Sequence, residues 1–340
     1  MANKKLHILL LLLLFALSSS AQQQWYFSVD ERYPAERKQL QNKQRILLVN
    51  NALTQPNDFG HTTIIDGESR GNIEEDLSRS VLYCLFATTQ TMELTGEFEA
   101  VELMDISQNH STNYYSRKPL TFSQAERLCA DYQADALLVL NQLVLYDLLE
   151  SFPTEEETYY AYLQAYAQSH WTIHYAGQSR EATFTQADTL LWESRLHYTR
   201  AQSLSDLPSR QEALLYLARE LGNRIGSSFT PSWQTTRRYI YDLPDLQAGL
   251  DAFRLQRWNS AINQWVTILD SKDKKAAACA AANIAIAYEM LGDYVSACDY
   301  ANEASRLFGA WKTAYGRQQQ ANIRYYLAQL QARQARERDL

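Results

Sequence analysis

Polar and apolar residues alternate with a period of two in residues 159–175 and again in residues 182–198. Apolar side chains occupy odd positions in the first stretch and even positions in the second. A turn at residues 177–180 pairs residues whose numbers sum to about 357, so odd positions meet even ones across the two strands. Both apolar rows then lie on one face, as a half-buried sheet requires. The pattern predicts a long antiparallel hairpin with Trp171 and Trp192 on the same buried face.

Shorter apolar runs and helix-capping patterns surround this hairpin. Runs of apolar residues bounded by polar ones are typical of buried strands, and Ser or Asn followed three residues later by Glu is typical of a helix start. The strands are expected at 45–50, 98–104 and 134–147, and the helices are expected to begin after Asn72, Ser123 and Ser209. Residues 51–71 hold Pro and Gly and are expected to be mostly loop. This order predicts a layered α/β domain over residues 22–230.

The pattern changes to helical spacing in the C-terminal part of the chain. In residues 279–304, small residues recur where two helices would cross closely, and Gly292 supplies a turn between them. A similar helix pair stands about 36 residues earlier, and an incomplete copy at 320–330 is expected to form a terminal capping helix. The sequence therefore predicts an α+β protein in which a connector at 231–244 joins the α/β domain to an all-α helical-repeat domain at 245–340.

The repeat domain resembles the tetratricopeptide repeat (TPR) superfamily over residues 245–335. The residues that carry this resemblance are Gly249, Ala261, Ala285, Tyr288, Gly292, Tyr294 and Ala297. The resemblance implies a right-handed stack of helix pairs whose concave face binds a protein or peptide partner. The partner-binding residues expected on that face are Leu250, Phe253, Arg254, Ile286, Glu289 and Met290. The alternative is that these side chains pack against the α/β domain, so that the repeats only brace it.

Three stretches make the whole chain similar to an uncharacterised family of exported Bacteroidetes proteins. They are RILLVNN at 45–51, ADALLVL at 134–140 and TPSWQTTRRYIYD at 230–242. The resemblance implies the same order of export signal, α/β domain and helical repeats. Many members of that family are lipoproteins, whereas the first cysteine of this chain is Cys84. We therefore expect no lipid anchor.

Residues 1–21 have the features of a cleavable signal peptide. Two lysines precede an apolar stretch at 6–17 that is too short to cross a bilayer, and small residues follow up to Ala21. We expect cleavage after Ala21 and an exported product, either periplasmic or secreted. The formal net charge of −7 argues against a nucleic-acid partner. No later apolar run is long enough to span a membrane.

One stretch matches a catalytic motif. Residues 67–71, with Ser69 at the centre, fit the G-x-S-x-G pattern of a nucleophile elbow, which needs a strand, a tight turn and a helix in that order. An envelope hydrolase with Ser69 as nucleophile is therefore the alternative function, although a polar loop before a helix explains the same residues. The chain has no phosphate-binding glycine loop and no HExxH motif. We expect a binding or assembly scaffold of the cell envelope and not an enzyme; a purely structural subunit is the third possibility.

The histidines do not predict a metal site. His170 and His174 have a spacing that would form a metal pair on a helix, but they lie on a predicted strand and are expected to face solvent. His197 is expected at the far end of the same hairpin. We predict no metal and no cofactor. The four cysteines also lack a metal-binding spacing, and a disulfide between Cys84 and Cys129 stays open.

Overall fold

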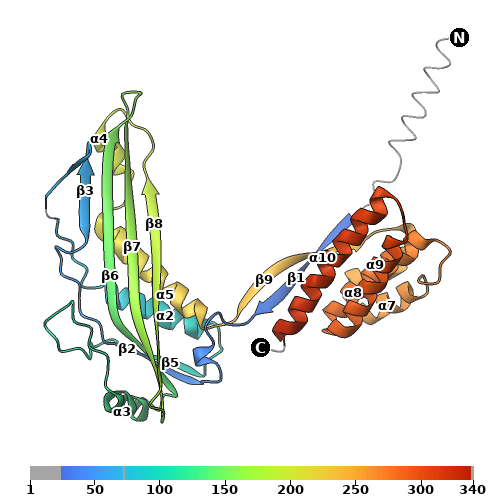
Figure 1. Ribbon diagram of the computed structural model, residues 1–340, viewed down its shortest axis with the longest axis horizontal. Helices are drawn as coiled ribbons and strands as arrows, with labels where there is room; N and C mark the ends of the chain where they lie inside the picture. Colours follow the sequence, from blue (N-terminus) through green and yellow to red (C-terminus); the bar gives the residue numbers. More distant parts are fainter. Residues whose placement is uncertain (1–23, 72, 338–340) are drawn as a thin grey trace. The chain divides into compact units, whose positions relative to one another are not determined.

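The computed structural model describes residues 24–71 and 73–337 and divides the chain into two compact units, each described here by itself (Figure 1). The sheet unit comprises residues 35–232. The described residues of the helical unit are 24–34 and 233–337. The protein is thus a mixed α+β chain with a β-rich N-terminal region and a helical C-terminal region. The expected signal peptide lies outside the described residues.

Seven strands form one sheet in the described part of the sheet unit. They are β2 (Arg45–Asn50), β3 (His61–Ile65), β4 (Glu68–Ser69), β5 (Ala100–Met104), β6 (Ala136–Pro153), β7 (Tyr159–Tyr175) and β8 (Glu181–Glu193). The long strand β6 organises the sheet. Its first half pairs in parallel with β2, its second half pairs in parallel with β3, and its whole length pairs antiparallel with β7. The buried strands expected at 45–50 and 134–147 are confirmed, but β3 and β4 lie where mostly loop was expected.

The predicted hairpin is present as β7 and β8. Trp171 pairs with Phe184, and Leu163 pairs with Trp192, so the paired numbers sum to 355. This sum differs by two from the expected one, which keeps odd positions opposite even ones. Both tryptophans therefore lie on one face, as predicted. Trp171 is 1% exposed, whereas Trp192 is only partly buried at the edge of the same core.

Helices cover both faces of the sheet. They are α2 (Ser80–Leu94), α3 (Phe122–Tyr132), α4 (Arg200–Ser205) and α5 (Arg210–Ser228), and a short 3-10 helix, η1 (Lys38–Leu40), precedes β2. Helices α2 and α5 pack on the face that carries Ile46 and Leu48, and α3 packs on the face that carries Leu47 and Val49. The continuous apolar run of β2 is explained by this burial on both faces.

Two of the three predicted helix starts are wrong. Asn72 lies outside the described residues, and α2 begins only at Ser80, because residues 73–77 run as loop. Helix α3 is capped by Thr121, whose side chain and Gln124 form the capping box two residues before the expected one. A Thr-x-x-Gln pair supplies the same reciprocal hydrogen bonds as Ser-x-x-Glu. The start of α5 at the capping box of Ser209 is confirmed.

The described part of the helical unit holds a two-stranded ribbon and five α-helices. The ribbon, defined as β1 (Gln24–Tyr33) paired with β9 (Ser232–Tyr241), is followed by η2 (Pro244–Leu246) and then by α6 (Gln247–Arg254), α7 (Trp258–Val266), α8 (Lys274–Met290), α9 (Tyr294–Gly309) and α10 (Ala314–Glu337). This corrects two expected boundaries. Residues 231–244 are mostly strand and not a connector, and β1 belongs to the helical unit and not to the first domain. The two strands find each other only across some 200 intervening residues, so no local pattern reveals the pairing.

Small residues allow the helices to approach closely. Ala281, Ala285, Ala297 and Ala301 are all fully buried between α8, α9 and their neighbours. The predicted turn is present at Gly292, whose φ of 75° favours glycine, and α9 begins directly after it. The C-terminal helix expected near 320–330 is α10.

Candidate functional site

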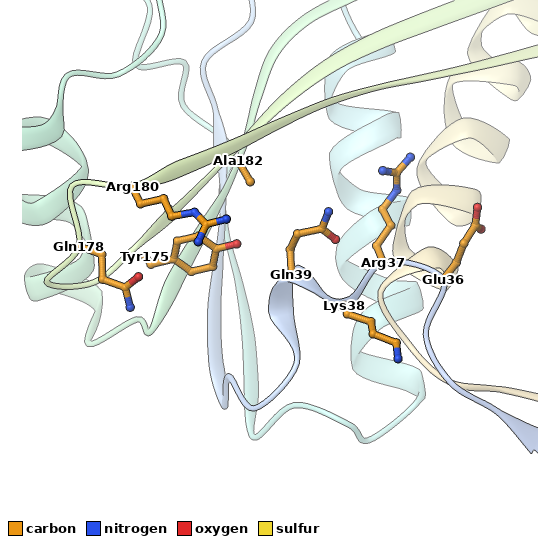
Figure 2. A pocket seen from close by; sticks show the side chains of 8 residues that line it. All are labelled: Glu36, Arg37, Lys38, Gln39, Tyr175, Gln178, Arg180 and Ala182. Atoms are coloured by element: carbon orange, nitrogen blue, oxygen red, sulfur yellow. The ribbon is translucent and has the colours of Figure 1, made fainter. Parts of the chain in front are cut away.

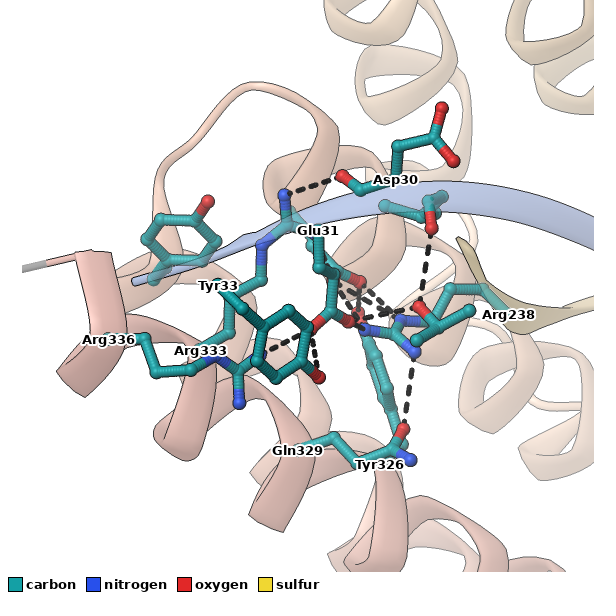
Figure 3. A network of polar contacts seen from close by, with 12 residues as sticks. Asp30, Glu31, Tyr33, Arg238, Tyr326, Gln329, Arg333 and Arg336 are labelled. Carbon is teal, nitrogen blue, oxygen red and sulfur yellow. Dashed lines mark hydrogen bonds and ion pairs between the residues drawn. The ribbon is translucent and has the colours of Figure 1, made fainter. Parts of the chain in front are cut away.

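A group of buried charges joins the ribbon to the helices (Figure 3). Glu289 on α8 is 2% exposed, and its carboxylate accepts hydrogen bonds from three residues. Arg238 of β9 donates from Nε at 2.9 Å, the Tyr326 hydroxyl of α10 donates at 2.8 Å, and Arg333 of α10 donates from Nη1 at 2.9 Å. Burial alone would lower the pKa of Arg238, but the hydrogen bond and charge of Glu289 raise it. The arginine therefore stays charged inside the unit.

Glu31 of β1 is the second buried acid of this group. It pairs with Arg238 and Arg336 and accepts a hydrogen bond from the Thr236 hydroxyl at 3.0 Å. Burial alone would raise the pKa of Glu31, but the hydrogen bond from Thr236 and the charge of Arg238 outweigh it and lower the pKa. Two carboxylates are thus surrounded by the guanidinium groups of Arg238, Arg333 and Arg336, and we call these five side chains the charge cluster.

A cavity of about 190 Å³ lies beside the charge cluster. We call it the tyrosine cavity, and its lining residues are Arg237, Arg238, Tyr239 and Tyr241 of β9, Ile286 of α8, and Asn322, Ile323, Tyr325, Tyr326 and Gln329 of α10. Tyr325 is 70% exposed. Arg238 is held in place by a bond from Nη1 to Gln329 at 3.2 Å, and the Tyr241 hydroxyl donates to Gln319 at 2.7 Å. The walls therefore combine aromatic faces with side chains of fixed orientation.

Four of the six expected partner-binding residues are buried inside the helical unit. They are Leu250, Phe253, Ile286 and Glu289; Arg254 is exposed and Met290 is half-buried. The ring of Phe253 lies 5.2 Å from that of Phe27 and 6.1 Å from that of Trp25, both on β1. The expectation of an open groove at the four buried residues is wrong, because they pack inside the helical unit, with Phe253 and Glu289 against the chain's own ribbon. The alternative is correct in part: β1 lies within residues 22–230, which the sequence assigned to the α/β domain, but the structure places this strand in the helical unit.

Ser69 does not lie in a nucleophile elbow. It belongs to β4, which forms a tight antiparallel hairpin with β3 through the turn at Gly67, and it is exposed. The next helix begins only at Ser80. The helix that the motif requires directly after the turn is therefore absent at this serine. A two-residue strand placed where a loop was expected explains the difference.

The expected solvent-facing histidines differ from each other. His170 is partly exposed and lies 2.9 Å from the Thr185 hydroxyl, whereas His174 is 5% exposed. The prediction of a solvent-facing His174 is wrong. His197 forms an isolated antiparallel β-bridge with Tyr159 at the far end of the hairpin, as expected. Within residues 24–71 and 73–337, no group of three or more His, Cys, Asp or Glu side chains is arranged to hold a metal ion.

One polar cluster of the sheet unit was not predicted. Asp147 of β6 contacts His61 of β3 and Arg210 of α5, and Arg210 also bonds to Thr63. The side chains of His61 and Asp147 are fully buried. These residues come from three separate elements, so no spacing along the sequence connects them. The cluster fixes β3 to the far half of β6.

The four cysteines are free thiols. Cys84 packs in the core between α2 and α5, and Cys129 packs in the core beneath α3. The two lie on opposite faces of the sheet, which excludes the disulfide that the sequence left open. Burial raises the pKa of Cys84 to about 12 and that of Cys129 to about 11.

Among the helices of the described residues, none combines the length and the apolar character that crossing a membrane would need.

Comparison with known proteins gives a family without an assigned role. No curated protein matches the chain. A PelC dodecamer from Paraburkholderia phytofirmans is similar over 60% of this chain and 99% of that chain, at 8% identity and a TM-score of 0.24. A single-residue variant of that dodecamer has the same coverage, with 7% identity and a TM-score of 0.22. These scores are too low to establish a shared fold.

Two family models match separate parts of the chain. The model for Domain of unknown function (DUF6340) matches residues 248–332, which hold α6 to α10 short of their outer ends. The model for Domain of unknown function (DUF8603) matches residues 43–241, more than half of the chain. The chain therefore belongs to the family described as Domain of unknown function (DUF8603).

Proposed function

We propose that the protein is an exported binding or assembly component of a bacterial cell envelope. In this proposal the helical unit is a set of TPR-like helix pairs, and a protein or peptide partner contacts it at the tyrosine cavity. Export rests on the signal-peptide features of residues 1–21. The protein acts by holding its partner and not by chemical conversion.

The packing of the helices supports the TPR-like interpretation. Helix α6 is followed by α7, and α8 by α9, with short turns and with alanines where each pair crosses. Gly249 of α6 packs against Trp265 of α7 so closely that a Cβ atom would lie 2.2 Å from Nε1 of the indole. Small residues at helix crossings are what such pairs require.

The ribbon supports the proposal that the partner is an extended protein or peptide segment. The face of α6 and α8 that the resemblance assigns to a partner is covered by β1 and β9, which are extended segments of the same chain. Phe27 and Trp25 lie against Phe253, and Arg238 lies against Glu289. Helices that hold an extended segment in this way are suited to recognising extended chains.

The observation that carries the proposal is the tyrosine cavity. Its volume of about 190 Å³ suits one side chain of a partner, and an exposed aromatic residue, Tyr325, lies among its lining residues. Tyrosine is enriched at the energetically dominant positions of protein interfaces because it offers a large rigid surface and a hydroxyl. Burial raises the pKa of the Tyr239 and Tyr241 hydroxyls, so both remain protonated.

The test is capture of the partner by matched variants. The whole exported protein is immobilised and exposed to envelope extract, and the same is done with Tyr325→Ala and with Tyr198→Ala. Tyr198 is 85% exposed and belongs to the sheet unit, so it removes a similar ring elsewhere. We expect the wild type and Tyr198→Ala to capture the same protein and Tyr325→Ala to lose it. Equal capture by all three would contradict the proposed site, and no specific capture by the wild type would favour a purely structural subunit.

A further inference from the structure

A second cavity lies in the sheet unit, apart from the site proposed above. It is an open pocket of about 700 Å³, which we call the basic pocket (Figure 2). Its lining residues are Glu36, Arg37, Lys38, Gln39, Tyr175, Gln178, Arg180 and Ala182. Three cationic side chains and one carboxylate line it. This excess of positive charge occurs in a chain whose formal net charge is −7.

Arg37 holds a fixed position with neutral neighbours. Its guanidinium lies 4.2 Å from the ring centre of Phe184, and Nη2 donates to Gln186 at 3.0 Å. Its backbone N–H donates to Ser228 at 2.7 Å, which ties the segment to the end of α5. Phe184 is itself stacked on Trp171 in the core. The positive charge is therefore pre-oriented by packing and not by a counter-ion.

Arg180 supplies a second positive charge in the pocket. It is exposed at the start of β8, and Figure 2 shows it beside Tyr175, with Gln39 between this pair and Arg37. The charge of Arg180 acts on the Tyr175 hydroxyl, and Lys43 lies 5.6 Å from the ring centre of the same tyrosine. Within residues 24–71 and 73–337, neither Arg37 nor Arg180 has a carboxylate at ion-pair distance.

Three buried arginines among the described residues behave differently. Arg210, Arg238 and Arg333 each pair directly with an aspartate or glutamate. Arg37 and Arg180 share one open pocket and have no acidic partners in the described part of the chain. Their uncompensated positive potential raises the local concentration of anions. Guanidinium groups are suited to oxyanions because their N–H donors match carboxylate and phosphate oxygens.

We propose that the basic pocket is a binding site for a small oxyanion-bearing ligand, with Arg37 and Arg180 as the residues that contact the anionic group. The shared chemistry is a carboxylate or a phosphate with several oxygens. Lys38 and Lys43 add positive charge, and the Gln39 and Gln178 amides offer hydrogen bonds to the rest of the ligand. The site is independent of the tyrosine cavity and lies in the other unit.

Calorimetric titration of the whole exported protein with pyrophosphate, and separately with citrate, tests the site. We expect at least one of the two to bind at low ionic strength and the affinity to fall as salt is added. Arg180→Gln should weaken binding at least tenfold, since tenfold corresponds to about 1.4 kcal/mol, the low end of what a hydrogen bond to a charged group contributes. Arg37→Gln should weaken it similarly. Binding of pyrophosphate alone would assign a phosphate ligand, and binding of citrate alone would assign a carboxylate.

The control is Arg219→Gln on α5, which removes a positive charge that lies beside Glu220 and outside the pocket. We expect this variant to bind as the wild type does. Because Arg180 is exposed, Arg180→Gln should keep the wild-type melting temperature, so a loss of binding reports on the site. Absence of binding by the wild type, equal binding by Arg180→Gln, or an equal loss in Arg219→Gln would each overturn the proposal.

Discussion

Arg238 on β9 donates from Nε to Oε2 of Glu289 on α8 at 2.9 Å, and each residue is 2% exposed. This contact joins an extended strand to a helix across a face that the sequence assigns to an external partner. Glu31 brings the other strand of the ribbon to the same arginine. Because Glu31, Arg238 and Glu289 each pair with two side chains of opposite charge, the ribbon is a fixed part of the helical unit.

The first prediction concerns this pair. Glu289→Ala leaves Arg238 and Arg333 without their shared carboxylate in a buried site, so the free energy of unfolding should fall by about 3 to 5 kcal/mol. Urea denaturation of the whole chain, in which the unfolding of the helical unit is monitored, measures the loss. The control Glu303→Ala breaks a surface pair with Arg306 and should cost about 0 to 1 kcal/mol.

A second prediction separates Glu289 from its predicted companion Arg254. Arg254 is exposed and its charge lies 5.7 Å from the ring centre of Trp25. Arg254→Glu should therefore change the free energy of unfolding by only about 0.5 to 1 kcal/mol, much less than Glu289→Arg. Thermal denaturation of the two single variants measures both effects. An equal loss in the two would mean that Glu289 is not buried among arginines, in conflict with the charge cluster.

The third prediction concerns the two tryptophans of the hairpin. Trp171 is nearly fully buried and stacks on Phe184, so Trp171→Ala should cost about 3 to 5 kcal/mol. Trp192 is partly buried and contacts Tyr216 at the edge, so Trp192→Ala should cost less, about 1 to 2 kcal/mol. The shift of the urea midpoint measures each variant. Equal costs would show that the hairpin register is displaced along the strands.

The sheet shows what a sequence pattern can reveal. Strands β2, β6 and β7 were predicted because their side chains alternate or are apolar throughout, and β7 and β8 were paired because a short turn joins them. The partners of β6 at its other edge could not be derived. Strands β2 and β3 align along the same edge of β6, and nothing local in either segment specifies this arrangement.

The candidate sites were predicted less well, for a physical reason. The TPR resemblance grouped Phe253, Ile286 and Glu289 on one face, and the structure does place all three beside the ribbon. What covers that face depends on β1, about 220 residues away from α6 in the sequence. The charge cluster, the tyrosine cavity and the basic pocket likewise combine distant segments, so spacing along the chain carried no signal for them.

The fourth prediction concerns the crossing of α2 and α5. A Cβ atom at Gly222 would lie 2.2 Å from the backbone oxygen of Cys84, and the Thr88 hydroxyl already donates to the oxygen of Gly222 at 3.1 Å. Gly222→Ala must push the helices apart and should destabilise the sheet unit by about 1 to 3 kcal/mol. The melting temperature measures the loss. Ser227→Ala, at an exposed position of the same helix, should stay within about 0.5 kcal/mol of the wild type.

The last prediction is a pH dependence that originates at His174. Burial lowers the pKa of His174 from its ordinary value of 6.5, although the charge of Glu181, 3.6 Å away, acts in the opposite direction. The unfolded chain therefore binds a proton at this residue at a higher pH than the folded chain does. As the pH falls through about 6.5, the free energy of unfolding should decrease, and the decrease should stop below the pKa of the folded state.

Replacing this imidazole tests the assignment. His174→Gln should show a smaller loss of stability than the wild type when denaturation is measured on both sides of about pH 6.5. Burial also lowers the pKa of His170, so part of the pH dependence should remain in this variant. His110→Gln removes an exposed imidazole from a loop and should reproduce the wild-type profile. If His174→Gln and His110→Gln gave the same profile, His174 would have to be accessible to solvent, in conflict with its exposed fraction of 5%.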